Sequence, residues 1–189
     1  MEQAKKRDHK IIITDVAIDK VSDVKLSDFS DGQQAEMTKR HKELLRVSHE
    51  RNNDNEVLFI DDVNFAGEVC VLGGEFKVSP ASNPFAVSVI SNAQRQSLIY
   101  MHNHPSTNNF SVGDVDTFIC EGAIKTMSVV TNQGNVYVFN KTKDYTYEKA
   151  RNLMKSVYES FPVGEIDNKQ FVSQFIKRCK EGGIEYAKS

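Results

Sequence analysis

Residues 97–114 read SLIYMHNHPSTNNFSVGD, an apolar run followed by two histidines, a proline, a polar loop and a Ser-x-x-Asp pattern. The apolar run predicts a short buried strand, and Pro105 ends it because proline has no N–H to donate to a neighbouring strand. Side chains of an extended strand alternate between its two faces, so His102 and His104 point to the same side. The two imidazoles can therefore reach one metal ion.

The residues after the polar loop have the pattern of a helix start. Ser111 suits the N-cap and Asp114 the third helical position, so the two can form a capping box. Phe110 and Val115 stand at the spacing of a hydrophobic staple. We therefore predict a helix from residue 112 to about residue 124, whose first turn holds Asp114 in a fixed geometry.

Together these two patterns predict a zinc site with His102, His104 and Asp114 as ligands. Zinc binds imidazole nitrogen and carboxylate oxygen, and a catalytic site keeps its fourth position for water. Each pattern alone is weak, because a His-x-His pair can arise by chance and Ser-x-x-Asp is a common capping box that needs no metal. Their occurrence together, with a strand end before the loop, favours the metal site.

The run HNHPS at residues 102–106, with Ser111 and Asp114 after it, resembles the motif of the JAB/JAMM (MPN+) zinc metalloprotease superfamily. That motif reads His-x-His, a short loop and Ser-x-x-Asp, and this wording is most similar to the bacterial RadC-like and phage- or toxin-associated branch. Six residues separate His104 from Ser111, where the common family pattern has seven. The resemblance covers residues 56–140 and implies the cytidine-deaminase-like JAB/MPN fold, a mixed sheet flanked by helices.

The resemblance also implies an upstream glutamate that acts as general acid and base, and three glutamates are candidates. Glu56 precedes the apolar run VLFI, where a polar segment gives way to a buried strand, so we prefer it. Glu68 lies in a second strand pattern, in which alternation could turn it to solvent, and Glu75 follows a Gly-Gly turn. Glu56 would take a proton from zinc-activated water as that water attacks a carbonyl carbon.

Ser111 has two interpretations that the sequence leaves open. The family resemblance implies a hydroxyl donor that stabilises the oxyanion of the tetrahedral intermediate. The helix pattern makes the same residue an N-cap, which contributes about 1 kcal/mol.

The implied activity is hydrolysis of an amide bond in a protein or peptide, including the isopeptide bond to a ubiquitin-like tail. Two alternatives stay open: a non-catalytic binding module of the same fold, and a RadC-like protein of a mobile element or a DNA-repair context. The net charge of −2 gives no reason to expect nucleic acid as the main partner. Three cysteines without paired spacing and a charged start predict a cytoplasmic protein, without a signal peptide or a membrane span.

Elsewhere, alternating strand and helix patterns predict an α/β protein in three parts: an N-terminal strand and polar segment (1–32), a JAB/JAMM-like catalytic core (33–144) and a C-terminal helical extension (145–189). The extension predicts a helical pair that either adds to the core or forms a partner-binding face. His41 and His49, on the first long helix, are expected at or near the surface rather than as ligands. The further expected elements are strands at 11–14, 57–61, 68–72 and 76–78, helices at 33–51 and 85–93, and a hairpin around 132–134.

Overall fold

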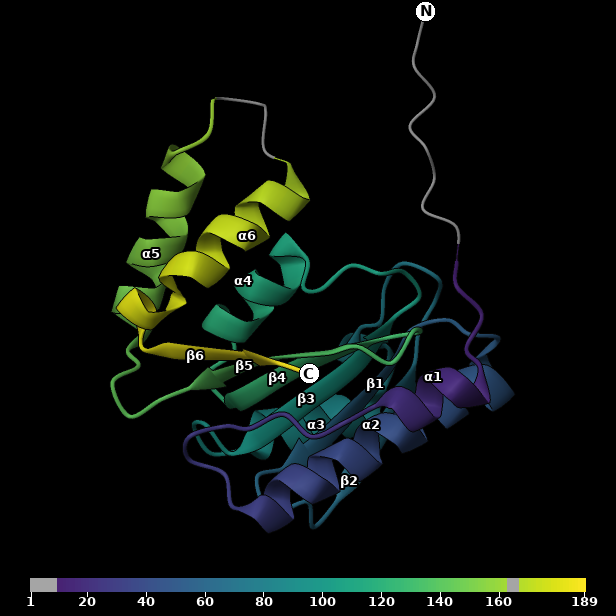
Figure 1. Ribbon diagram of the computed structural model, residues 1–189. Coiled ribbons are helices and arrows are strands. Elements are labelled where there is room, and N and C mark those ends of the chain that lie inside the picture. The colour runs from purple at the N-terminus through teal and green to yellow at the C-terminus, as the bar shows by residue number, and fades with distance from the viewer. Residues whose placement is uncertain (1–9, 163–166) are drawn as a thin grey trace, which may run out of the picture.

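The computed structural model describes residues 10–162 and 167–189 as one sheet with helices on both sides (Figure 1). Helices α1 and α2 cover one face of the sheet, and α4, α5 and α6 cover the other. The elements are α1 (Asp15–Lys20), α2 (Asp31–Asn52), β1 (Val57–Asp62), β2 (Glu68–Leu72), the 3-10 turn η1 (Pro80–Ser82), α3 (Pro84–Asn92), β3 (Leu98–His104), α4 (Val112–Cys120), β4 (Ile124–Thr131), β5 (Val136–Lys141), α5 (Tyr147–Glu159), α6 (Asn168–Arg178), the 3-10 turn η2 (Cys179–Gly182) and β6 (Ile184–Lys188).

The sheet has six strands in the order β2-β1-β3-β4-β5-β6. Neighbouring strands are antiparallel except β3 and β4, which run parallel and are joined across one face by α4. A parallel pair needs such a crossover, because the chain must return to the edge at which the first strand began. The protein is thus a mixed α/β fold with a six-stranded sheet flanked by helices, as the sequence predicts.

Strand alternation divides the core into two layers. In β3, Leu98 and Tyr100 pack into the layer of α4, α5 and α6, whereas Ile99 and Met101 pack into the layer of α2. Because the alternation continues along the strand, the two histidines lie on the α4 side and Asn103 on the α2 side. The prediction that His102 and His104 share one face is confirmed.

Several predicted elements are confirmed with small shifts in their ends. The long amphipathic helix is α2, which begins with a capping box between Ser30 and Gln33. The helix after Asn83 is α3, with the Asn83 side chain accepting hydrogen bonds from the first turn. Strands β1, β2, β4 and β5 stand where the sequence predicts strands.

Two predicted strands are absent, and the predicted end of one helix is wrong. Residues 11–14 form no regular strand, because their backbone groups bond to loops instead: Ile11 N–H donates to Pro105 O at 2.7 Å. Residues 76–78 also form no strand. Strand β3 ends at His104, directly before Pro105 as predicted. Helix α4 ends at Cys120, short of the predicted end near residue 124, because Ile124 already begins β4.

His41 is buried, contrary to prediction. His41 lies on the buried side of α2, and only 1% of the residue is exposed. Its Nε2 lies 2.7 Å from Ser128 Oγ. Burial lowers the pKa of His41 to about 3, so the ring is neutral at physiological pH. His49 is exposed, as predicted.

The hairpin between β4 and β5 turns at Gly134, which has a φ of 81°. A Cβ at this position would lie 2.1 Å from the carbonyl oxygen of Ala17 in α1. Glycine is therefore required here both by the turn and by the close approach of α1.

Both ends of the described chain contribute to the core. Ile13 and Leu26 join the α2-side cluster, and Phe171 and Phe175 of α6 join the α4-side cluster, so the C-terminal helical pair adds to the core. Strand β6 was not predicted, and it extends the sheet at the β5 edge. Residues 1–9 of the predicted N-terminal segment lie outside the described residues. Within the described part of the chain, no helix is long and apolar enough to cross a membrane.

Candidate metal centre

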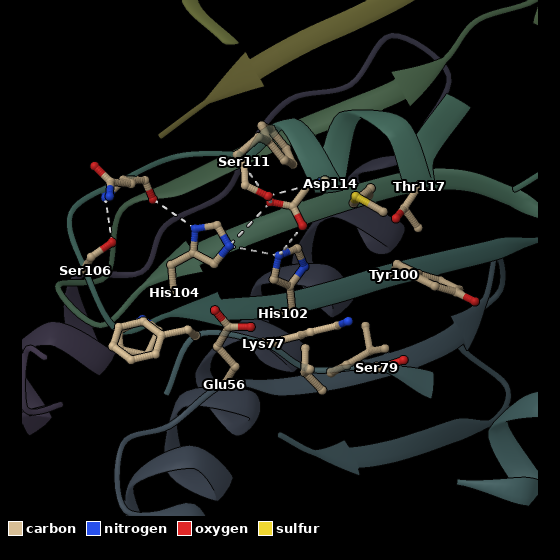
Figure 2. A pocket seen from close by; sticks show the side chains of 18 of the residues that line it. Glu56, Lys77, Ser79, Tyr100, His102, His104, Ser106, Ser111, Asp114 and Thr117 are labelled. Carbon is tan, nitrogen blue, oxygen red and sulfur yellow. Dashed lines mark hydrogen bonds and ion pairs between the residues drawn. The ribbon is translucent and has the colours of Figure 1, made fainter. Parts of the chain in front are cut away.

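Two elements bring the predicted ligands together (Figure 2). The end of β3 supplies His102 and His104, and the first turn of α4 supplies Asp114. The two Nε2 atoms are 3.1 Å apart, Asp114 Oδ1 is 3.3 Å from His102 Nε2, and Asp114 Oδ2 is 3.5 Å from His104 Nε2. These three side chains could hold a metal ion.

The spacing of the ligand atoms suits a small tetrahedral ion. Zinc–ligand bonds of about 2.0–2.1 Å place the ligand atoms of a tetrahedron roughly 3.3 Å from one another. The two Nε2 atoms, 3.1 Å apart, are close to that value, and one ligand atom from each of the three residues lies within 4.8 Å of the other two. The donor set of two imidazoles and one carboxylate fits zinc, and it also suits other divalent transition metals.

Asp114 is held by the predicted capping box, which is confirmed. Its Oδ2 accepts hydrogen bonds from Ser111 N at 2.6 Å and from Ser111 Oγ at 2.7 Å, and Asp114 N donates back to Ser111 Oγ at 3.1 Å. The helix start thus engages Oδ2 and leaves Oδ1 directed at His102. In this arrangement the Ser111 hydroxyl donates its hydrogen bond to Asp114.

The ring of His104 is oriented by a second contact. Its Nδ1 lies 3.2 Å from the backbone carbonyl oxygen of Asn108, to which it can donate a proton. A proton on Nδ1 leaves the lone pair of Nε2 free for a metal, and such partners commonly fix the tautomer of metal-binding histidines. Both histidines are buried, with His102 5% and His104 8% exposed.

Glu56 lies in the same cleft, just before β1. Glu56 is 8% exposed, and Figure 2 shows its carboxylate pointing toward the two histidine rings. Backbone bonds fix its position: Glu56 N–H donates to Gly74 O at 3.0 Å, and Glu56 O accepts from Gly73 N at 2.8 Å. Of the three candidate glutamates, this one is both buried and near the ligands.

The other two candidates lie elsewhere. Glu68, in β2, accepts a hydrogen bond of 2.8 Å from Arg40 Nη1 and does not line the cleft. Glu75 lines the cleft but is exposed. The structure therefore brings Glu56 to the ligands and assigns Glu68 to an ion pair.

The charges of the site are strongly coupled. Burial raises the pKa of Glu56, and the two histidines offset part of that rise. Burial also acts to raise the pKa of Asp114, but His102 and His104 outweigh it and hold that pKa well below its usual range. Burial acts to lower the pKa of His104, yet its bond to Asp114 leaves the pKa raised. Protons and a metal ion therefore compete for the same imidazole nitrogens.

The ligands line an open cleft of about 1260 Å³. Its floor beside the histidines is apolar and is formed by Leu58, Tyr100 and Met127. Tyr100 was not predicted here, although it stands two residues before His102 and alternation places it on the same face. Residues 75–80, of which 76–78 were predicted to form a strand, line another side of the cleft.

Comparison of the chain with protein-family models, with curated proteins and with solved structures found no match in any of the three. The description of the site therefore depends on the geometry of this chain alone.

Proposed function

We propose that this chain is a zinc-dependent hydrolase of amide bonds, a metallopeptidase or isopeptidase of the JAB/JAMM type. One observation carries the proposal: His102, His104 and Asp114 converge within a cleft that also contains the buried carboxylate of Glu56. Ligands with a neighbouring carboxylate base are the parts that metal-assisted hydrolysis requires.

Each residue has a distinct role in this proposal. The imidazoles of His102 and His104 and the carboxylate of Asp114 would hold the ion. When bound, zinc lowers the pKa of a water molecule from 15.7 to about 7 and polarises a carbonyl group. The Glu56 carboxylate accepts the proton of the attacking water and returns it to the leaving amine.

Ser111 can serve both of its predicted roles in turn. Asp114 Oδ2 receives two hydrogen bonds from this residue, one from the backbone and one from the hydroxyl. If the hydroxyl rotates toward an oxyanion, the backbone bond of 2.6 Å still holds Asp114. The capping arrangement is thus compatible with oxyanion stabilisation.

The size of the cleft supports a peptide substrate. Small-molecule pockets are typically about 300–1,000 Å³ in volume, whereas this cleft, at about 1260 Å³, is larger. We propose a protein or peptide segment as substrate, and the amide joined to a ubiquitin-like tail is the finer form of this proposal.

The first test is bound zinc, measured by elemental analysis of the native protein and of His104→Ala. We expect about one zinc per native chain and little in the variant, whereas His49→Ala, which changes an exposed histidine, should keep the metal. Unchanged zinc in His104→Ala would remove the site assignment.

The second test is hydrolysis. The zinc-loaded protein is assayed against short peptides and ubiquitin-like fusions, with Glu56→Gln as the control that keeps zinc. Cleavage by the native protein alone supports the enzyme. Zinc binding without cleavage of any amide would favour the non-catalytic module.

A further inference from the structure

Asn103, between the two histidines, has no part in the proposed chemistry and is fully buried. It lies on the opposite face of β3, in the layer between the sheet and α2, where its neighbours in the strand pack into an apolar core. Burying an unpaired amide in such a place costs several kcal/mol. Its partners therefore matter to the fold and to whatever they connect.

The Asn103 side chain bonds to the backbone on both sides of Glu56. Its Oδ1 accepts a hydrogen bond of 2.7 Å from Val57 N, and its Nδ2 lies 3.2 Å from the carbonyl oxygen of Asn55. The same Nδ2 lies 2.8 Å from Asn132 Oδ1, which orients the amide.

This connection stands where the backbone ladder stops. The pairing of β1 with β3 ends with Leu58 opposite His102. Beyond that pair, Val57 N bonds to the Asn103 side chain. The amide thus continues the link between the two strands just where one carries Glu56 and the other carries the ligands.

The turn before Glu56 depends on its surroundings for its shape. Asn53 and Asp54 are both left-handed, with φ values of 51° and 57°. Non-glycine residues in this conformation are strained and persist only when neighbouring contacts hold them. Here the Asp54 side chain contacts Ile13 N at 3.1 Å and His49 Nδ1 at 2.8 Å. This segment therefore does not set the position of Glu56 by itself.

We propose that Asn103 is a positioning residue, which fixes the Glu56 carboxylate relative to the metal ligands by tying the backbone around Glu56 to the strand of His102 and His104. The kinetic part of this inference rests on the proposed function. The structural part, the tie between Asn103 and the segment at Glu56, does not.

The test compares Asn103→Ala with a matched control, Asn140→Ala. Asn140 is likewise fully buried in the sheet and hydrogen-bonded through its side chain, to Thr126 Oγ1 at 2.9 Å and Asp28 Oδ1 at 2.7 Å, but far from the ligands. Both variants lose a buried amide, so both should lose stability. Only Asn103→Ala should change kcat.

For the zinc-loaded Asn103→Ala protein we expect kcat to fall about 10²-fold, the effect of misplacing a reacting group by about 1 Å, with KM little changed. In a Glu56→Gln background the same substitution should have little further effect, because the group that it positions is already gone. An equal loss in both backgrounds, or an equal kinetic loss in Asn140→Ala, would overturn the proposal.

A readout that needs no activity separates this inference from the proposed function. Relative to core amides that exchange through global unfolding, the Val57 amide should exchange roughly tenfold faster in Asn103→Ala, as expected for loss of one hydrogen bond. In Asn140→Ala this relative rate should stay unchanged. Unchanged exchange at Val57 would disprove the tie even if the native protein hydrolyses amides. Faster exchange in a protein that cleaves no amide would instead retain the tie and reject the proposed function.

If Asn103→Ala does not fold, Asn132→Ala gives the same test in a milder form. It removes one acceptor of the Asn103 amide and leaves Asn103 in place, with its bond to Ser48 Oγ. It also removes the bond from Asn132 Nδ2 to Asp54 O. A smaller fall in kcat together with a smaller acceleration of exchange at the Val57 amide supports the proposal. No change in kcat or in this exchange contradicts it.

Discussion

The two ends of β1 carry two buried carboxylate clusters that are neutralised in different ways. At one end Asp61, whose side chain is fully buried, pairs with Arg40 at 3.2 Å, and Arg40 also bonds to Glu68 at 2.8 Å. At the other end Glu56 and Asp114 face two imidazoles in an open cleft. The chain supplies a permanent cation to the first cluster and two imidazoles, the proposed metal ligands, to the second.

The kind of partner that each carboxylate has indicates whether the carboxylate is structural. A carboxylate that already has a guanidinium partner is held in place by it, and removing that partner leaves a buried charge without compensation. A carboxylate beside imidazoles, in a cleft that solvent can enter, is available for an ion and a substrate. The partner, more than burial, thus distinguishes Glu56 from Glu68.

The largest expected difference between the two clusters appears when one glutamate of each is neutralised. Glu56→Gln should lower kcat by about 10²–10⁴-fold, the usual contribution of a general base, while zinc content stays the same. Glu68→Gln should leave kcat nearly unchanged. Steady-state hydrolysis by the two zinc-loaded variants checks this, and equal losses would erase the distinction between the clusters.

A large effect on stability is expected at the other end. Arg40→Met leaves Asp61 buried without its cation, which typically costs about 3–5 kcal/mol. Urea unfolding measures the loss, and zinc content should not change. Lys39→Met is the matched control, because Lys39 is exposed and its ion pair with Glu36 contributes at most about 1 kcal/mol. A small loss in Arg40→Met would show that the cation matters little there.

Lys141 is a second buried cation. Unlike Arg40, it bonds to a backbone carbonyl oxygen, that of Glu121, at 2.9 Å. Burial lowers the pKa of Lys141 from 10.5 to about 8. Between pH 8 and 10.5 the unfolded chain then binds more protons than the folded chain, so this lysine makes stability rise with pH across that window.

The total gain from Lys141 is at most about 3 kcal/mol. Urea unfolding of the native protein and of Lys141→Met at pH 7 and pH 10 measures it. The native protein should gain stability relative to the variant at the higher pH. A difference that is independent of pH would show that Lys141 keeps an ordinary pKa.

The smallest expected effect comes from the cap of α4. Ser111→Ala should cost about 1 kcal/mol of stability and weaken zinc binding by about 10–100-fold, because Asp114 loses a bond that orients it. Thr146→Ala removes the N-cap of α5 and should cost a similar stability without touching zinc affinity. Competition with a chelator measures the affinities, and equal values for both variants would contradict the role of the cap.

The ligands could be predicted from sequence because their geometry is local. Alternation along one strand brings His102 and His104 together, and a capping box of four residues fixes Asp114. The placement of Glu56 rather than Glu68 in the cleft depends on how β1, β2 and β3 pair, and no short pattern specifies that pairing.

The missed elements depend on distant partners. The run at residues 11–14 has the composition of a strand, but Ile11 and Ile13 bond to loops near Pro105 and Asp54. Strand β6 forms because the edge of β5 is open to it, as the pairing of Phe139 with Tyr186 shows. His41 is buried because α2 covers the centre of the sheet, which helix periodicity alone does not reveal.

The polar contacts of the segment at residues 10–13 also set an order of events during folding. Asn132 Nδ2 reaches Ile11 O across 121 residues of chain, and the same Asn132 orients Asn103. Contacts over such separations form slowly, because a long loop must close before they stabilise anything. We therefore expect refolding to restore helix content before it protects the Val57 amide from hydrogen exchange, because that amide bonds to Asn103.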